Sequence, residues 1–262
     1  MRGDKRGVLF PARLPTFHRV PAPERVSAFV RWFWIPEWDI APGRASRQEL
    51  IAFPACNLVV EPNLVGLSGP TTRRSFRDLT GSGWGVGALL RPAAVPHFTD
   101  DPGSLRDVYQ QLDLPALHDA VATVMTRPGD AAARRSVAVE AFADWLSIEM
   151  PAPADEALLA NAMAELIDAD PAVVRVDDAA TRLGVSARTV QRLARRYIGL
   201  PPTALIRRRR LQEAAERLRT DPDADISAVA AEFGYADHAH LTADFRTVLG
   251  FTPSVYRRRA RP

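Results

Sequence analysis

Two stretches in the last third of the chain, VDDAATRLGV at 176–185 and ISAVAAEFGY at 226–235, repeat one pattern of apolar and polar residues. Gly184 and Gly234 occupy equivalent positions in the two copies. In each copy a short amphipathic helix is expected to end at the glycine, because glycine tolerates the left-handed backbone that closes a helix. A second helix is expected to follow within a few residues, so each copy predicts a helix-turn-helix.

The second helix of each copy is expected to open with a capping side chain, Ser186 in one and Asp237 in the other. Between the copies, the apolar residues of 202–220 recur at helical spacing and predict one connecting helix. One helix-turn-helix is a weak signal, since the motif occurs in many folds, but two copies on a rigid connector are a stronger one. A connector of about 17 residues spans roughly 25 Å, which would let the two second helices reach successive major grooves of DNA.

At this point the sequence resembles a known family. The stretch GYADHAHLTADFRTVLGFTPSVYRRR at 234–259 is similar to the signature end of the AraC/XylS family of transcription regulators. The shared features are Tyr235, Phe245, Arg246, Gly250, Pro253 and Tyr256 with the arginines that follow it. The stretch 184–218 resembles the first helix-turn-helix and connecting helix of that family, and the resemblance as a whole covers 155–259.

Two residues depart from the family pattern. Ala194 stands where the family often has phenylalanine, which is expected to loosen the packing under the first recognition helix. Ala243 stands where many members place a long polar or basic side chain. The second recognition helix is therefore expected to contribute less base readout than the first.

Several polar residues are predicted to contact DNA. In the first recognition helix, three- and four-residue spacing puts them on one face, and the resemblance implies that Arg188, Gln191 and Arg192 read bases while Arg195 meets phosphate. The full predicted set is Ser186, Arg188, Gln191, Arg192, Arg195, His238, His240, Thr242 and Arg246. The alternative for each is a solvated helix face. The run 207–210, four arginines around the connecting helix, is expected to place one or two on phosphate and to pair the rest with acids such as Glu213.

Composition agrees with a regulator of two domains. The chain has 262 residues, a hydrophobic fraction of 47% and a formal net charge of +3. Because the net charge is small, DNA binding would depend on basic residues clustered on one face. Cys56 is the single cysteine, which excludes a disulfide framework and a zinc finger and favours a reducing, cytoplasmic setting. No stretch of about 18 apolar residues and no apolar leader is present, so neither a membrane span nor secretion is expected.

The proline-rich break MPAPAD at 150–155 predicts a linker at 150–154, between a front domain at 1–149 and a DNA-binding domain at 155–262. Short apolar runs with glycine and proline between them predict strands in the front domain. These expected strands are 28–35, 49–53, 57–61, 63–67, 73–79 and 83–90. Helical spacing follows from 105 to 148. The predicted class is α+β: a β-rich, barrel-like domain with two following helices, then an all-α domain of two helix-turn-helix units joined by a long helix.

That order resembles the sensor domain that many AraC/XylS regulators carry in front of their DNA-binding part. In FPACNLVV at 53–60, Ala55 and Cys56 replace an expected Asp-Gly pair, so no polar contact is carried over there. The three histidines at 18, 97 and 118 lack the spacing of a metal site, and the usual catalytic motifs are missing. We therefore expect no metal, no cofactor, no catalytic residue and no enzymatic activity.

Three tryptophans near the start of the front domain are its most unusual feature. Trp32 and Trp34 share one face of a strand and, with Trp38, could line a pocket for a small apolar or aromatic effector. The alternative is that they fill a barrel core. Cys56 is expected to be a buried apolar residue rather than a redox sensor. The helix expected at 130–148 is either a dimer contact or a lid on the sheet.

The sequence thus predicts a cytoplasmic, sequence-specific DNA-binding transcription regulator, controlled through its front domain by a small-molecule effector. Expected partners are double-stranded DNA at two adjacent turns, a second copy of the chain, and RNA polymerase if the protein is an activator. One alternative is a ligand-independent dimeric DNA-binding protein whose front domain only assembles subunits. A DNA-binding repair enzyme is another class, but such front domains need several metal-binding cysteines and this chain has one.

Overall fold

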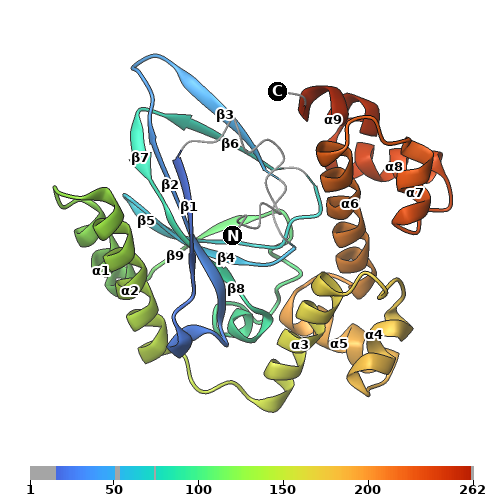
Figure 1. Cartoon of the computed structure of the whole chain (residues 1–262). Helices are drawn as coiled ribbons and strands as arrows, with labels where there is room; N and C mark the ends of the chain where they lie inside the picture. Colours follow the sequence, from blue (N-terminus) through green and yellow to red (C-terminus); the bar gives the residue numbers. More distant parts are fainter. Residues whose placement is uncertain (1–15, 51–53, 74, 261–262) are drawn as a thin grey trace.

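The computed structural model describes residues 16–50, 54–73 and 75–260. Within the described residues, a front part, 16–149, holds two antiparallel sheets, two α-helices and two short 3-10 helices, and a helical part, 155–260, holds seven α-helices (Figure 1). Of the expected domains and strands, residues 1–15, 51–53, 74 and 261–262 lie outside the described residues. The predicted fold class, a β-rich region followed by helix-turn-helix units on a long helix, is confirmed.

The main sheet of the front part has seven strands, in the order β1-β2-β8-β4-β5-β9, with β7 paired to β2. Their bounds are β1 Thr16–Pro21, β2 Val30–Asp39, β4 Asn57–Glu61, β5 Leu64–Ser68, β7 Ser82–Trp84, β8 Val86–Leu90 and β9 Tyr109–Leu112. The expected strand 57–61 is found with those bounds, and 63–67 and 28–35 are found with shifted ends. The expected strand 83–90 is divided between β7 and β8, and the edge strands β1 and β9 were not predicted.

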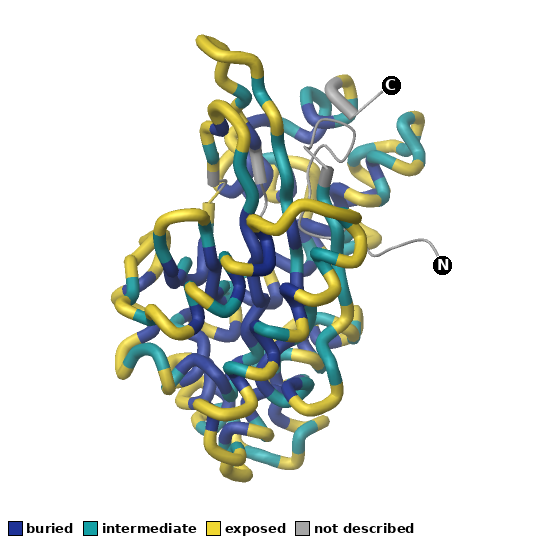
Figure 2. The backbone as a smooth tube through the Cα atoms, turned by 90° about the vertical axis from the view of Figure 1, so that its left-hand side faces the viewer, coloured by how far each residue is buried: buried dark blue, intermediate teal, exposed yellow. Residues whose placement is uncertain are grey.

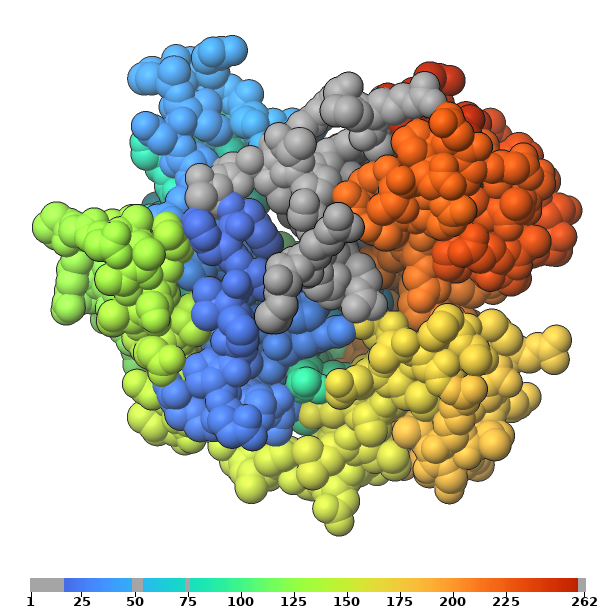
Figure 3. All heavy atoms as spheres, viewed as in Figure 1, coloured from blue at the N-terminus to red at the C-terminus, as the bar shows by residue number. Residues whose placement is uncertain are grey.

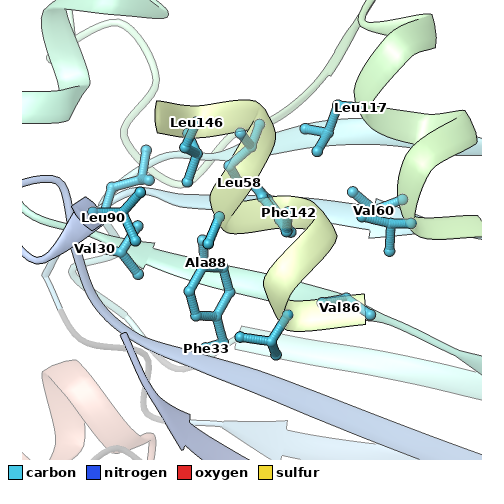
Figure 4. Packing of buried hydrophobic residues seen from close by; sticks show 14 of the residues in the cluster. Val30, Phe33, Leu58, Val60, Val86, Ala88, Leu90, Leu117, Phe142 and Leu146 are labelled. Carbon is cyan, nitrogen blue, oxygen red and sulfur yellow. The ribbon is translucent and has the colours of Figure 1, made fainter. Parts of the chain in front are cut away.

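Helices α1 (Pro115–Met125) and α2 (Ala131–Glu149) cover one face of the main sheet and form the core with it. Alternate residues of β2 point toward these helices: Phe33 and Ile35 are completely buried, and the Phe33 ring meets Phe142 of α2 edge-on (Figure 4). Burying such side chains is the main stabilising contribution, about 1.5–3 kcal/mol for each large apolar residue. The helix expected at 130–148 thus closes the sheet, while its outer face leaves Val137 and Ile148 exposed.

The opposite face of the main sheet carries large aromatic rings over glycines. The Trp34 indole lies against Gly87 on the neighbouring strand, where a β-carbon would collide with the ring. A second sheet of β3 (Ala45–Leu50) and β6 (Ser75–Thr80) projects beyond this face (Figure 1). Glu61 joins the two sheets, because it accepts a hydrogen bond from Tyr109 at 2.6 Å and pairs with Arg77 of β6. Gly66, Gly83 and Gly87 therefore make room on this face for the rings of Tyr109, Trp38 and Trp34.

The helical part contains two units that share one helix. Its bounds are α3 Asp155–Ala169, α4 Val176–Leu183, α5 Ala187–Tyr197, α6 Pro202–Thr220, α7 Ile226–Glu232, α8 His238–Leu249 and α9 Pro253–Ala260. The first unit, α3 to α5, buries its core against the start of α6, and the second, α7 to α9, packs on the rest of α6. Helix α6 has 19 residues and so extends about 28 Å at 1.5 Å per residue.

The two repeats end their first helices in the same way. Gly184 and Gly234 both adopt left-handed backbone conformations, with φ of 65° and 71°. The amide of the next residue then returns to the helix, from Val185 to the Ala180 carbonyl at 3.0 Å and from Tyr235 to the Ala230 carbonyl at 2.9 Å. Such hydrogen bonds satisfy carbonyls at the helix end that would otherwise lack a donor. The repeat seen in the sequence is therefore a repeat of backbone hydrogen bonds.

Helix α3 fastens the helical part to the front part. Asn161 is buried and bridges a short 3-10 helix and a turn, since it accepts from the Ala93 amide at 2.9 Å and donates to the Ala28 carbonyl at 2.7 Å. Arg91 pairs with Glu165 and Arg31 with Asp168 further along the same helix. In the space-filling view the yellow helices lie directly against the front part (Figure 3).

The buried residues form separate cores in the front part and in the two helical units. The dark blue segments run through the middle of the molecule, and the loops at its edges are yellow (Figure 2). Among the helices of the described residues, none is both long and apolar enough to cross a lipid bilayer.

Candidate nucleic-acid interface

Helix α5 presents a basic face to solvent. Val190, Leu193 and Ala194 are completely buried on its inner side, and the four predicted DNA contacts from this helix, at 188, 191, 192 and 195, are exposed on the outer side. The side chain of Ser186 begins the helix by accepting a hydrogen bond from the Thr189 amide at 3.1 Å. No acid occurs within α5, so this face offers guanidinium and amide groups suited to phosphates and base edges.

One acid outside α5 contacts this face. Glu156, in the first turn of α3, accepts from Arg192 at 2.6 Å, from Arg196 at 2.9 Å and from the Tyr197 hydroxyl at 3.2 Å. The hydrogen bond from Arg192 holds the pKa of Glu156 below its ordinary value. Within the described residues, Arg188 and Arg195 make no hydrogen bond or ion pair. The arginines of α5 are therefore divided between two that Glu156 holds and two that extend into solvent.

Helix α8 presents a weaker set of groups. His238, His240 and Arg246 are exposed, and the ring of His240 meets Tyr235 edge-on at 5.2 Å between centroids. Asp237 caps the helix by accepting from the His240 amide at 2.7 Å. Thr242 differs from the prediction of an outward position: its hydroxyl is buried, with no hydrogen-bond partner in the described part of the chain. A contact from that hydroxyl to DNA would require another rotamer.

The arginine run 207–210 is occupied by contacts within the protein. Successive residues of a helix point about 100° apart, so these four arginines point in different directions. Arg207 pairs with the buried Asp244 of α8 at 2.7 Å, and Arg210 donates to the carbonyls of Phe233 and Gly234 at the end of α7. On another side, the buried Arg209 donates to the carbonyl of Asp170 and, at 2.9 Å, to that of Val173. The run therefore joins both helix-turn-helix units to α6.

The expectation of phosphate contacts from this run stays a prediction, and the structure gives those side chains protein partners instead. Glu213, the acid expected to pair with the run, lies 3.9 Å from Arg209. Sequence reasoning did not identify Asn161, Glu156 or the capping by Arg209 as structural contacts. The one signal for Asn161 was its position as an amide among the alanines of an otherwise apolar helix face.

The three tryptophans already make contacts within the front part. Trp34 stacks on Phe17 and donates to the Asn57 side chain at 2.9 Å, and Trp38 donates to the Thr80 carbonyl at 3.2 Å. The ring of Trp32 lies under the guanidinium of Arg19 at 4.4 Å. All three are half-buried on the sheet face away from α1 and α2, and their role in binding an effector stays a prediction. Cys56 is buried, and burial raises the pKa of its thiol to about 12.

Comparison with known proteins agrees with this geometry. Residues 179–259 match a family described as a helix-turn-helix domain, and residues 18–108 match a domain of unknown function (DUF6597). The transcriptional activator AarP of Providencia stuartii is 33% identical over 82 residues, which are 31% of this chain and 60% of AarP. The activator RhaS of Escherichia fergusonii is 31% identical over 102 residues, which are 39% of this chain and 36% of RhaS. The chain thus spans less than two thirds of either relative.

Two solved structures to which the chain is similar differ in the extent of the match. ToxT from Vibrio cholerae is 12% identical, with a TM-score of 0.42, and the match covers 93% of this chain and 97% of ToxT. A probable AraC family transcriptional regulator from Rhodopseudomonas palustris is 28% identical, with a TM-score of 0.35, over 40% of this chain and 98% of that one.

Two helix-turn-helix units on one shared helix, with a basic face on the first recognition helix, have the arrangement of the DNA-binding part of a transcription regulator. More specifically, the match at residues 179–259 and the two activators support an AraC/XylS-type DNA-binding region in this chain. The relatives it matches are regulators of transcription and not enzymes.

Proposed function

We propose that the chain is a sequence-specific regulator that reads two successive major grooves with α5 and α8, and that a small-molecule effector acting through the front part controls it. The observation that carries the first half is the exposed row Arg188, Gln191 and Arg195 on a helix with a buried opposite face. Arginine recognises guanine, and glutamine adenine, through paired hydrogen bonds. In this proposal the sensor domain is 1–149, the linker is 150–154 and the DNA-binding domain is 155–262.

Helix α5 supplies most of the base readout in this proposal, and α8 supplies weaker and more general contacts. Helix α5 contains four arginines, whereas α8 contains one, Arg246. Arg207 of α6 also contacts α8, but it is bound to the buried Asp244. The histidines His238 and His240 would add hydrogen bonds to bases or phosphates. The operator is therefore expected to be strongly specified in one half and loosely specified in the other.

The function also implies partners and a setting. The protein would work on double-stranded DNA in the cytoplasm, with RNA polymerase as a partner if it activates transcription, and it would have no enzymatic activity. A homodimer through the outer face of α2 would use the exposed Val137 and Ile148. Sedimentation of the full chain with Ile148→Glu distinguishes this contact, because a dimer through α2 would dissociate and a monomer would be unaffected.

Selection of bound fragments from random DNA tests the proposal directly. The wild-type chain should enrich one site with two halves, and Arg188→Ala should relax the preference in one half, with a loss of about 1–3 kcal/mol of discrimination at the affected base pair. Arg127→Ala, an exposed arginine between α1 and α2, is the matched control and should leave the site unchanged. Enrichment of no sequence would contradict the proposal and favour an architectural protein that only bridges DNA.

A further inference from the structure

The two helix-turn-helix units pack on α6 through separate apolar cores. The core of the first unit includes Leu205 and Ile206 of α6, and the core of the second begins at Leu211. The arginine run 207–210 lies between these cores, on the helix that passes from one unit to the other in Figure 1. Apolar burial is not directional. A directional contact made from this run therefore has a strong influence on how the second unit lies along α6.

One arginine of the run reaches the second recognition helix. Arg207 pairs with Asp244, in the middle of α8, at 2.7 Å between Nη2 and Oδ1. The Asp244 side chain is 7% exposed, whereas that of Arg207 is 47% exposed. A buried carboxylate requires a charged or hydrogen-bonding partner, because it has lost its water. The position of Asp244 is therefore tied to Arg207, while Arg207 by itself can turn to solvent.

Asp244 also belongs to a polar cluster between α6 and the start of α8. The hydroxyl of Tyr235 is buried, burial raises its pKa, and the carboxylate of Asp244 adds to that shift. The ring of Tyr235 lies under the Arg210 guanidinium at 4.4 Å and meets His240 edge-on at 5.2 Å. Residues three apart share one side of a helix, so Arg207 and Arg210 face the same unit. The cluster thus connects α6 to a residue of α8 that is predicted to contact DNA.

A small displacement at this contact is enough to change which DNA site fits. Base pairs are stacked about 3.4 Å apart, and one turn of an α-helix rises about 5.4 Å. A shift of α8 along α6 by less than one helical turn therefore moves its reading face by one base pair relative to α5. An ion pair between two defined atoms resists such a shift, and single polar contacts fix the register of helices in coiled coils.

We infer that Asp244 is a positioning residue: through its pair with Arg207 it fixes α8 along α6, and so restricts the protein to DNA sites with one spacing between their halves. The inference rests on the proposed function, because it concerns how two recognition helices are held for reading. It extends that function to a residue that lies on the buried side of α8. The alternative is a pair that contributes to stability and leaves the spacing to the apolar cores.

Distance measurement by double electron–electron resonance in the full chain tests the inference without DNA. Nitroxide labels at Thr181→Cys of α4 and Thr247→Cys of α8, two exposed positions, report the separation of the units in a Cys56→Ala background. The chain with Asp244 should give one narrow distance distribution. Asp244→Leu, which frees Arg207 to turn to solvent, should broaden it at least twofold. Asp244→Asn keeps an oxygen that accepts from Arg207 and should restore the narrow distribution.

A matched control removes a different ion pair between α6 and the second unit. Arg217 of α6 lies 3.5 Å from Glu232 of α7, and both side chains are exposed. Glu232→Gln should leave the distribution as narrow as in the wild type, because exposed pairs restrain little. If Asp244→Leu loses its far-ultraviolet circular dichroism, the double variant Arg207→Met with Asp244→Leu takes its place, since apolar side chains often replace a buried ion pair without loss of stability.

Binding to duplexes of altered spacing tests the consequence for DNA. The two halves of the site selected by the wild-type chain are joined with one base pair fewer, with the selected number, or with one more. The wild-type chain should bind the selected spacing at least tenfold more tightly than either other spacing, and Asp244→Leu should reduce that preference below threefold. Arg246→Ala, at an exposed position predicted to contact DNA, should weaken binding at all three spacings by the same factor.

The inference is overturned if Asp244→Leu keeps the narrow distribution, if Glu232→Gln or Asp244→Asn broadens it as much as Asp244→Leu does, or if Asp244→Leu loses affinity equally at all spacings. These outcomes are separate from those of the proposed function. A selected site with an unchanged spacing preference in Asp244→Leu would keep the regulator and remove the role of Asp244. A broadened distribution in a chain that selects no DNA would keep the positioning of α8 and remove the regulator.

Discussion

Glu156 and Arg192 form an ion pair of 2.6 Å across the first helix-turn-helix, so that one of the predicted base-reading arginines is held by an acid of α3. The same carboxylate forms a second ion pair with Arg196, at 2.9 Å. If Arg192 reads DNA as predicted, it exchanges this partner for a base or a phosphate. The acid therefore sets part of the free-energy difference between the free and DNA-bound states.

Replacing Glu156 with glutamine is expected to strengthen DNA binding by about two- to fivefold, since exposed ion pairs contribute about 0–1 kcal/mol. The change leaves a hydrogen-bond acceptor for Tyr197 and removes the charge that holds Arg192. Fluorescence anisotropy over a range of salt concentrations measures the gain. Asp155→Asn, one residue away and exposed, makes the same charge change and should give a smaller gain. Equal gains in the two variants would mean that the pair does not restrain Arg192.

Arg209 holds the first unit on α6, so its removal should destabilise that junction. Arg209→Met leaves the carbonyls of Asp170 and Val173 without this donor, and we expect a loss on the order of 3 kcal/mol in the free energy of unfolding. Urea denaturation followed by circular dichroism measures it. Arg258→Met, an exposed arginine of α9, should change the free energy by less than about 0.5 kcal/mol. A loss for Arg209→Met no greater than that of Arg258→Met would contradict the capping role.

Asn161 holds the front part to α3, and Asn161→Ala should loosen that contact without unfolding either part. The Ala93 amide and the Ala28 carbonyl would lose their partners. Hydrogen exchange should accelerate at least tenfold at the amides of Ala93, Ala94 and Val95, and proteolysis within 150–154 should become faster. Leu158→Ala, on the exposed side of the same helix, is the control. Unchanged exchange at Ala93 would show that other contacts hold the junction.

Glu37 ties β2 to α2 and makes stability depend on pH. Burial raises the pKa of this carboxyl, but the hydrogen bonds from Arg135 at 2.6 Å and Arg134 at 2.9 Å outweigh it, and the net shift is downward. A carboxyl with a lowered pKa in the folded state stabilises the protein above its unfolded pKa of about 4.3, and that contribution is lost as pH falls through the folded value.

Glu37→Gln should therefore lower the free energy of unfolding by about 1–2 kcal/mol at pH 7, and the difference from wild type should shrink as pH falls below about 4. Urea titrations at a series of pH values measure this. Glu149→Gln, on the exposed end of α2, should show little difference at any pH. A difference that is constant from pH 7 to pH 3 would mean that the ion pairs are not its source.

The helix-turn-helix repeat was predictable because its signals are local. The glycine at 184, the cap at 186 and the apolar spacing of α5 lie within a dozen residues, and each fixes a backbone conformation without help from distant parts. The strands β2, β4 and β5 were predictable from short apolar runs bounded by turn residues. Edge strands β1 and β9 were not, because an edge strand is paired on one side only and β9 has one half-buried and three exposed residues.

The arginine run shows where local reasoning stops. The residues 207–210 are identical in the sequence, and only the tertiary structure shows that Arg208 lies buried at the junction while Arg207, Arg209 and Arg210 hold other helices. Their contacts depend on residues more than 20 positions away in either direction, such as Val173 and Asp244. A basic cluster in a DNA-binding chain therefore does not identify phosphate contacts by itself.

The central claim is that α5 and α8 of one chain occupy successive major grooves. Hydroxyl-radical footprinting of the full chain on its selected site tests this most directly. The account predicts two protected regions on one face of the duplex, about one helical turn apart, of which Arg188→Ala weakens one and Arg246→Ala the other. A single protected region, or equal weakening of both regions by Arg188→Ala, would contradict the account.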